Sequence, residues 1–141
     1  MLQEVKALFH KELSEHNIAC EITIDPPGLH LEGDENMLKQ VIINLVKNSL
    51  EALKQSNNGA INIMARKENS QHIIAVADNG PGIPVEHMDD IFTPFFSTRD
   101  DGSGIGLSFS KQIVRLHGGT ISIQSEPGKG CTVTMRFSMT E

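Results

Sequence analysis

The sequence contains no tryptophan and no tyrosine, only two cysteines, and no run of basic residues. Cys20 and Cys131 lie far apart, so we expect two reduced thiols in a cytoplasmic protein and no disulfide framework. The net charge of −6 disfavours a nucleic-acid partner, because binding to a phosphate backbone needs a basic face. No apolar stretch approaches the roughly twenty residues of a membrane span, and no signal peptide is visible. We therefore expect no direct contact with a membrane.

The patterns of several common sites are missing as well. The six histidines show no spacing typical of metal ligands, which argues against zinc. No G-x-x-x-x-G-K-[ST] pattern occurs, which excludes a P-loop protein. The run Gly102-x-Gly104-x-Gly106 lacks both the G-x-G-x-x-G spacing and a directly preceding strand, which argues against a dinucleotide-binding fold.

The periodicity of apolar residues predicts one α+β domain over residues 1–141, a length that buries a core without disulfides or metals. Asp34 is the expected N-cap of the most apolar helix. Helices that share one face of a mostly antiparallel sheet form a two-layer α/β sandwich. We expect helices at residues 2–13, 35–55 and 102–117, and strands at 18–24, 61–66, 72–77, 120–124 and 132–137, with a shorter one at 29–31.

Two asparagines interrupt the apolar pattern of the helix at 35–55. Asn44 and Asn48 are four residues apart and so project from the same helical face. Asparagine is a poor residue for a helix interior, because its amide competes for backbone hydrogen bonds. One explanation is a solvated polar edge. The other is a site for Mg²⁺, because an amide oxygen is a suitable neutral ligand for Mg²⁺ that is shared with phosphate oxygens.

A carboxylate and two glycines follow the strand at 72–77. The run Asp78-Asn79-Gly80-Pro81-Gly82 is common in turns, where the carboxylate faces water or caps the turn. In a binding site, Asp78 would accept a hydrogen bond from an exocyclic amine such as that of adenine, and Gly80 and Gly82 would give the base room. The pattern alone leaves both interpretations open.

A second glycine cluster opens the helix at 102–117. The run Gly102-x-Gly104-x-Gly106 offers backbone N–H groups and the positive end of a helix dipole, which together bind phosphates. Arg99 either reaches such a phosphate or is a solvated loop charge. Between the two glycine clusters lie three of the six phenylalanines, Phe92, Phe95 and Phe96. We therefore expect the connecting loop to form a flap over a flat, phosphate-bearing ligand.

Four segments occur in a specific order. Asn44-Leu45-Val46-Lys47-Asn48-Ser49 is similar to an N box, and Asp78 to Gly82 is similar to a first glycine box. Phe92-Thr93-Pro94-Phe95-Phe96 is similar to an F box, and Gly102 to Leu107 is similar to a second glycine box. This order resembles the catalytic and ATP-binding domain of sensor histidine kinases, within the gyrase, chaperone, histidine kinase and mismatch-repair ATPase superfamily. The similarity covers residues 2–138, essentially the whole chain.

The resemblance implies the Bergerat ATP-binding fold with three main helices on one face of the sheet, Mg-ATP as the cofactor, and an ATP lid at about residues 83–103. It implies that Asp78 binds the adenine amino group and that Asn48 holds Mg²⁺, with Asn44 beside it as a second catalytic residue. The implied cofactor-binding residues are Asn48, Asp78, Gly80, Gly82, Ile83, Phe96, Arg99, Gly102, Ser103, Gly104, Ile105, Gly106, Leu107 and Thr132. The family commonly has Ser or Thr after the last glycine, where this chain has Cys131, and this weakens a hydroxyl contact to adenine there.

The resemblance favours phosphoryl transfer to histidine over hydrolysis of ATP. Hydrolases of the superfamily carry a glutamate four residues before the Mg²⁺-binding asparagine, as a general base for water. Asn44 occupies that position and cannot accept a proton, whereas a neutral histidine acceptor needs no such base. A stand-alone ATPase and a non-catalytic nucleotide-binding pseudokinase are the alternatives.

The histidine that accepts the phosphoryl group is expected to lie outside this chain. Family acceptors occur in a dimerising helical hairpin with an H-E-[LI]-[RK]-x-P pattern, and His10-Lys11-Glu12-Leu13 lacks its acidic neighbour and its proline. The expected partners are a histidine-bearing dimerisation domain of the same kinase and the receiver domain of a response regulator. We expect the isolated domain to be a monomer and the parent kinase to be a homodimer, either cytoplasmic or anchored in a membrane.

Overall fold

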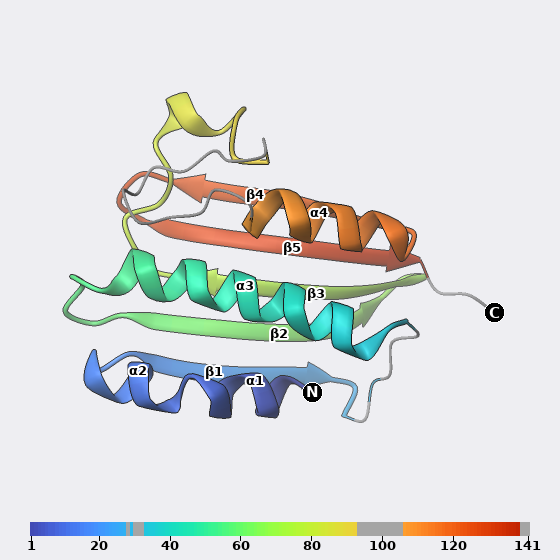
Figure 1. Cartoon of the computed structure of the whole chain (residues 1–141), viewed down its shortest axis with the longest axis horizontal. Coiled ribbons are helices and arrows are strands. Elements are labelled where there is room, and N and C mark those ends of the chain that lie inside the picture. Colours follow the sequence, from blue (N-terminus) through green and yellow to red (C-terminus); the bar gives the residue numbers. More distant parts are fainter. Residues whose placement is uncertain (28, 30–32, 93–105, 139–141) are drawn as a thin grey trace.

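The computed structural model describes residues 1–27, 29, 33–92 and 106–138 of the chain (Figure 1). The helices of this part are α1 (Leu2–Leu8), α2 (His10–Glu15), α3 (Glu35–Leu53), the short 3-10 helix η1 (Val85–His87) and α4 (Gly106–Leu116). The strands are β1 (Ala19–Asp25), β2 (Ala60–Glu68), β3 (Gln71–Asp78), β4 (Gly119–Glu126) and β5 (Gly130–Ser138).

These strands form one mixed sheet in the order β1-β2-β3-β5-β4. β2 and β3 form the antiparallel hairpin that the sequence predicts, with Ile63 opposite Val76. β5 pairs antiparallel with both β3 and β4, whereas β1 lies parallel to β2. A parallel pair needs a long crossover connection, and α3 supplies it between β1 and β2. The predicted α+β sandwich with a mostly antiparallel sheet is confirmed.

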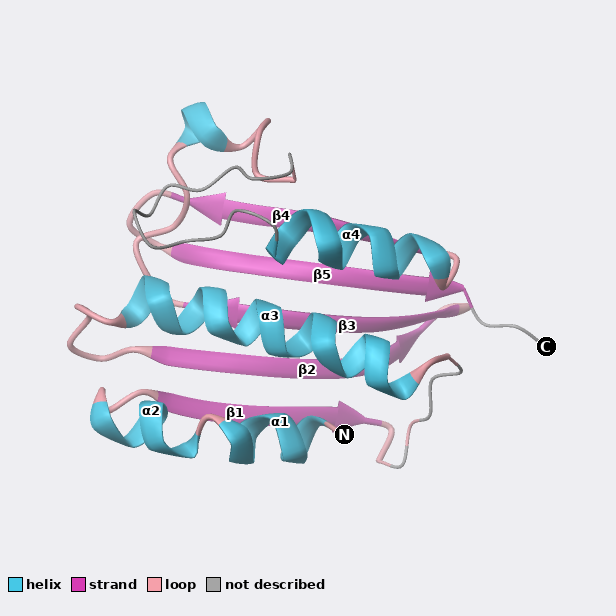
Figure 2. Ribbon diagram, in the orientation of Figure 1, coloured by secondary structure: helices cyan, strands magenta, loops and turns pink. Residues whose placement is uncertain are grey.

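The helices α1 to α4 all lie on one face of the sheet, as Figure 2 shows. α3 turns an apolar stripe toward the strands, because apolar residues recur at helical spacing along it. The buried hydrophobic residues of this stripe are Leu38, Val41, Ile42, Leu45, Val46, Leu50 and Leu53. They share one core with the inward residues of the central strands, Ile61, Ile63, Ile74, Val76, Val133, Met135 and Phe137.

Some predicted boundaries are wrong. The N-terminal helix is not continuous, because the backbone of Phe9 leaves the helical conformation at φ −104° and ψ 12°, and α2 begins at His10. The break lets Phe9 and Leu13 pack on the core, whereas Leu8, which helical spacing puts on the apolar face, is 59% exposed. α3 ends at Leu53, two residues before the predicted end near Gln55.

Other expectations fall partly outside the described residues. Leu29 is not in a strand, and residues 30 and 31 of the short predicted strand lie outside the described part. The last helix is described from Gly106, so residues 102–105 of its predicted range also lie outside. None of the helices in the described ranges is long and apolar enough to cross a membrane.

One histidine joins the start of α3 to the end of α4. Asp34 caps α3 as predicted, because its carboxylate accepts a hydrogen bond from the N–H of Met37 at 3.1 Å. The N–H of Asp34 donates in turn to Nε2 of His117 at 3.0 Å. Nδ1 of His117 lies 2.9 Å from the carbonyl oxygen of Ile113, so both ring nitrogens are satisfied in the neutral Nδ1–H tautomer. This link lies at the end of the molecule away from Asp78, where β3 ends (Figure 1).

Replacing His117 by alanine removes the acceptor for the N–H of Asp34. We expect the free energy of unfolding to fall by about 0.5–1.5 kcal/mol, the net contribution of a typical hydrogen bond, because the N–H of Asp34 is exposed and can bond to water instead. Urea denaturation followed by circular dichroism measures the change. His10→Ala, at an exposed position of α2, is the control and should stay within about 0.5 kcal/mol of the parent. An equal loss in both variants would contradict the linking role of His117.

Candidate functional site

The carboxylate of Asp78, at the end of the central strand β3, is held by three donors. The backbone N–H of Gly80 donates to Oδ1 at 2.9 Å, and the hydroxyl of Ser49 on α3 donates to Oδ2 at 3.1 Å. The backbone N–H of Cys131, which lies opposite Asp78 on β5, is the third donor. Helix α3, the end of β3 and the start of β5 therefore meet at one carboxylate.

Burial raises the pKa of the Asp78 carboxyl above its ordinary value. The three hydrogen bonds act in the opposite direction, because they stabilise the charged form, but burial is the largest cause. Asp78 is only partly buried, and an ionised carboxylate offers about four acceptor directions. The group is therefore suited to accept a further hydrogen bond from an N–H group of a ligand.

The glycine turn after β3 is held by the hairpin of β4 and β5. The N–H of Ile83 donates to Oγ of Ser125 at 2.6 Å, and Ser125 donates to the carbonyl oxygen of Gly130 at 3.2 Å. Gly82 has φ +77°, and a side chain there would collide with the carbonyl oxygen of Glu126. The turn and the hairpin thus form a clamp in which two backbones approach closely.

The neighbours of Asp78 in the turn also serve the fold. Oδ1 of Asn79 accepts from the N–H of Ala60 at 2.8 Å, and Nδ2 donates to the carbonyl oxygen of Asn58 at 2.8 Å. Asn79 therefore fixes the connection between α3 and β2. Gly80 is buried, and a Cβ there would lie 3.4 Å from one side-chain atom each of Ala52 and Leu53 on α3.

Cys131, and not Thr132, shares the face of the sheet that carries Asp78. Cys131 lies opposite Asp78 and Thr132 lies opposite Ala77, and side chains alternate between faces along a strand. The structure therefore does not bring Thr132, a predicted cofactor-binding residue, to the carboxylate. Burial and the neighbouring charge of Asp78 raise the pKa of the Cys131 thiol to about 11, so the thiol stays protonated at neutral pH.

The asparagine pair of α3 lies in the same region. Asn44 and Asn48 are both half-buried, and Asn48 directly precedes Ser49, the residue that is bonded to Asp78. Oδ1 of Asn44 accepts from Nε2 of Gln40, one turn earlier, at 3.2 Å. α3 therefore carries the predicted Mg²⁺ ligand Asn48 next to Ser49, the residue that donates to the predicted adenine-binding carboxylate.

The donors of this pair fit a shared Mg²⁺ and not a metal held by protein alone. Among the residues that the structure describes, no group of three or more His, Cys, Asp or Glu could hold a metal ion. The donor set consists of neutral amide oxygens, and these suit Mg²⁺ where phosphate oxygens and water supply the remaining ligands.

Two of the residues predicted to meet phosphate are described. Gly106 is the first residue of α4, and Leu107 packs against the hydrophobic core. The predicted lid is described from Ile83 to Phe92. The remaining predicted cofactor-binding residues lie outside the described part: Phe96, Arg99, Gly102, Ser103, Gly104 and Ile105.

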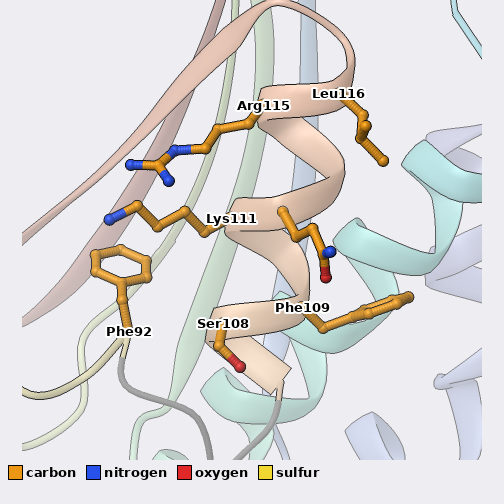
Figure 3. A pocket seen from close by; sticks show the side chains of 7 residues that line it. Phe92, Ser108, Phe109, Lys111, Arg115 and Leu116 are labelled. Carbon is orange, nitrogen blue, oxygen red and sulfur yellow. The ribbon is translucent and has the colours of Figure 1, made fainter.

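A groove of about 680 Å³ follows the outer side of α4 beside Phe92 (Figure 3). Nζ of Lys111 lies 5.0 Å from the centroid of the Phe92 ring, which is a cation–π contact. Lys111 and Arg115 extend to the same side of the helix in Figure 3. Asp78 and Asn48 are not among the residues that line the groove, so it is separate from the carboxylate site.

Two residues of the site were not predicted from the sequence. Ser49 is 5% exposed and occupies a position of the apolar stripe of α3, between Val46 and Leu50. A serine in an apolar stripe needs a partner, and this signal could have identified it. Ser125 gave no such signal, because its contact with Ile83 depends on the pairing of distant segments.

Comparison with protein families matches residues 33–141 to the histidine kinase-, DNA gyrase B- and HSP90-like ATPases. The chain is 38% identical over 131 residues to sporulation kinase C of Bacillus subtilis (strain 168), a match that covers 92% of this chain and 30% of that protein. It is 42% identical over 109 residues to the C4-dicarboxylate transport sensor protein DctB of Rhizobium meliloti (strain 1021), covering 77% and 18%. The chain thus spans less than a third of the length of these relatives.

Solved structures share the fold. The nucleotide-free catalytic domain of histidine kinase ThkA matches with a TM-score of 0.86 and 34% identity, covering 98% of this chain and 90% of that one. ThkA in complex with the response regulator protein TrrA matches with a TM-score of 0.82 and 33% identity, covering 99% and 39%. Full-length ShkA in complex with AMPPNP matches with a TM-score of 0.85 and 25% identity, covering 99% and 30%. The predicted fold is confirmed by these matches.

The clamp on the glycine turn can be tested with a matched pair of glycines. Gly82 and Gly128 have φ +77° and +81°, but a side chain at Gly128 would meet no atom within 4 Å. We expect Gly128→Ala to lower the free energy of unfolding by about 1–2 kcal/mol, the cost of a left-handed backbone. Gly82→Ala adds a collision with the carbonyl oxygen of Glu126 and should cost more. Urea denaturation measures both, and equal losses would contradict the clamp.

The raised pKa of Asp78 predicts a pH dependence of stability. The folded protein holds this proton to higher pH than the unfolded chain does. The free energy of unfolding should therefore fall as pH rises from the ordinary pKa of 3.8 to the raised value. Asp78→Asn removes this titration, so its stability relative to the parent should increase from acid to neutral pH. Paired urea denaturation curves measure the difference, and a constant difference would refute the prediction.

Proposed function

This chain belongs to the family of histidine kinase-, DNA gyrase B- and HSP90-like ATPases, and from that premise we propose that it binds Mg-ATP and donates the γ-phosphate to a histidine of a separate dimerisation domain. Its relatives include sporulation kinases and sensor histidine kinases, and this supports a kinase domain that binds nucleotide. The observation that carries the proposal is Asp78, a partly buried carboxylate that three donors hold at the end of β3.

In this proposal Asp78 selects adenine. The exocyclic amine of adenine donates to an acceptor direction of the carboxylate that Gly80 and Ser49 do not use. The base lies near Cys131, whose protonated thiol adds no second negative charge beside Asp78. A neutral, half-buried thiol next to a charged acceptor suits a flat base that carries one amino group.

The phosphates extend toward α4 and toward the asparagines of α3. α4 begins at Gly106, and the positive end of a helix dipole favours negative charge there. Asn48 would hold Mg²⁺ through its amide oxygen, with Asn44 beside it, and Mg²⁺ when bound supplies charge neutralisation between the phosphates. The neutral amide donors described above support this assignment.

The transfer step needs a nucleophile with an available lone pair. A neutral histidine nitrogen attacks the γ-phosphorus, the bond from phosphorus to the bridging oxygen breaks, and ADP leaves with the electron pair. Water would need a positioned base to lose its proton, and the carboxamide of Asn44 cannot serve as one. This difference favours a histidine acceptor over hydrolysis.

The acceptor histidine and the response regulator are proposed as separate partners. Sequence relatives are more than three times longer than the matched region, which leaves room for a dimerisation domain in a parent protein. ThkA, a kinase of similar fold, forms a complex with a response regulator. The receiver aspartate of such a regulator would then take the phosphoryl group from the histidine.

The test follows γ-labelled ATP with Mg²⁺ in two reactions, one with the chain alone and one with an added histidine-bearing dimerisation domain. Free phosphate and protein-bound label are measured separately. We expect little of either from the chain alone, and label on the added domain in the second reaction. Asp78→Asn should abolish most of that label, because it loses adenine recognition while keeping the fold.

The other outcomes contradict the proposal in distinguishable ways. Steady release of phosphate from the chain alone would make it an ATPase despite Asn44. Stable label on His10, an exposed residue of α2, would place the acceptor in this chain. No label in either reaction, together with no binding of Mg-ATP, would identify a non-catalytic module.

A further inference from the structure

We propose that Ser49 is a positioning residue for adenine recognition: its hydroxyl holds the Asp78 carboxylate in the orientation and charge state that accept the 6-amino group. The inference rests on the proposed function, because it assumes that Asp78 contacts adenine. It concerns a residue of α3 whose side chain acts on the ligand only through Asp78.

The position of Ser49 in α3 is one where an apolar residue would be expected. It is 5% exposed, in a stripe whose neighbouring positions are Leu45, Val46, Leu50 and Leu53. A hydroxyl at such a position loses its hydration and must find a partner. The partner is Oδ2 of Asp78 at 3.1 Å, across the contact between α3 and β3.

Ser49 is also the sole side chain in the described residues that donates to Asp78. The other two donors are the backbone N–H groups of Gly80 and Cys131, whose positions are set by the turn and by the strand pairing. The N–H of Gly80 donates to Oδ1 and the hydroxyl of Ser49 donates to Oδ2, so the two contacts together orient the plane of the carboxylate. Without the hydroxyl, only the two backbone donors restrain rotation about the terminal side-chain bond.

The same hydrogen bond is one of the contacts that favour the ionised form of Asp78. Burial favours the neutral acid, and donors to the carboxylate favour the ionised form. Loss of the Ser49 hydroxyl would therefore move the titration of Asp78 to higher pH, and a protonated Asp78 presents a donor in place of one acceptor. Both effects weaken a contact with an amino group and leave the rest of the nucleotide site unchanged.

The experiment measures nucleotide binding by calorimetry for the parent, Ser49→Ala and Ser122→Ala. Ser122 is an exposed serine of β4 on the opposite face of the sheet, so its variant is the matched control. The probes are Mg-ATP and Mg-purine riboside triphosphate, which has hydrogen in place of the 6-amino group. Affinities are compared over a pH series that starts at the ordinary aspartate pKa of 3.8 and ends at neutral pH, because the raised pKa of Asp78 lies above that starting point.

We expect Ser49→Ala to weaken ATP binding about tenfold, as for loss of a hydrogen bond to a charged group, and to change binding of purine riboside triphosphate by less than about twofold. The acid limb of ATP binding should move to higher pH in Ser49→Ala and stay in place in Ser122→Ala. In an Asp78→Asn background, Ser49→Ala should have no further effect on ATP.

Two results would overturn the inference and spare the proposed function: equal weakening of both nucleotides, which indicates a merely structural serine, or an unchanged affinity and pH profile. Failure of the proposed function has a different signature. In that case the parent itself would bind the two nucleotides equally, and Asp78→Asn would leave ATP affinity unchanged. Urea denaturation of Ser49→Ala in the absence of nucleotide confirms that the variant is folded.

Discussion

A carboxylate that is taken partly out of water must be supplied with hydrogen-bond donors, and the arrangement of this domain follows from how Asp78 meets that requirement. One donor comes from the glycine turn, one from β5 and one from α3. The turn can donate only if Gly80 packs against α3. β5 can donate only if it pairs with β3 as well as with β4, the strand that precedes it in sequence. The position of the site therefore depends on the strand order of the sheet.

Hydrogen bonds between the glycine turn and the hairpin of β4 and β5 also hold the surroundings of Asp78 in place without a ligand. In the clamp, the N–H of Ile83 donates to the hydroxyl of Ser125 on β4, and this hydroxyl donates to the carbonyl oxygen of Gly130 on β5. An acceptor that is oriented in advance loses little conformational freedom on binding, which improves affinity for a given set of contacts. The partly buried Asp78 is less stable as an anion in the free protein, and a bound amino group offsets that cost.

Local features were readable from the sequence, and non-local ones were not. The stripe and the Asp34 cap of α3 depend on neighbouring residues, so spacing alone predicts them. Thr132 was predicted at the site, but the register of β5 against β3 gives that face to Cys131, and a shift by one residue reverses every side chain. Ser49 was readable as a polar residue in an apolar stripe, whereas the partner of Ser125 depended on the folded chain.

The connection from β3 to α4 joins two segments that are themselves bonded to the rest of the domain. Ile83 is bonded to Ser125, and α4 is bonded through His117 to the start of α3. Closing a loop between fixed ends costs a free energy that rises only with the logarithm of loop length. A change in the length of this connection should therefore cost little stability, so that related kinases can vary its length while they keep the same sheet and the same carboxylate.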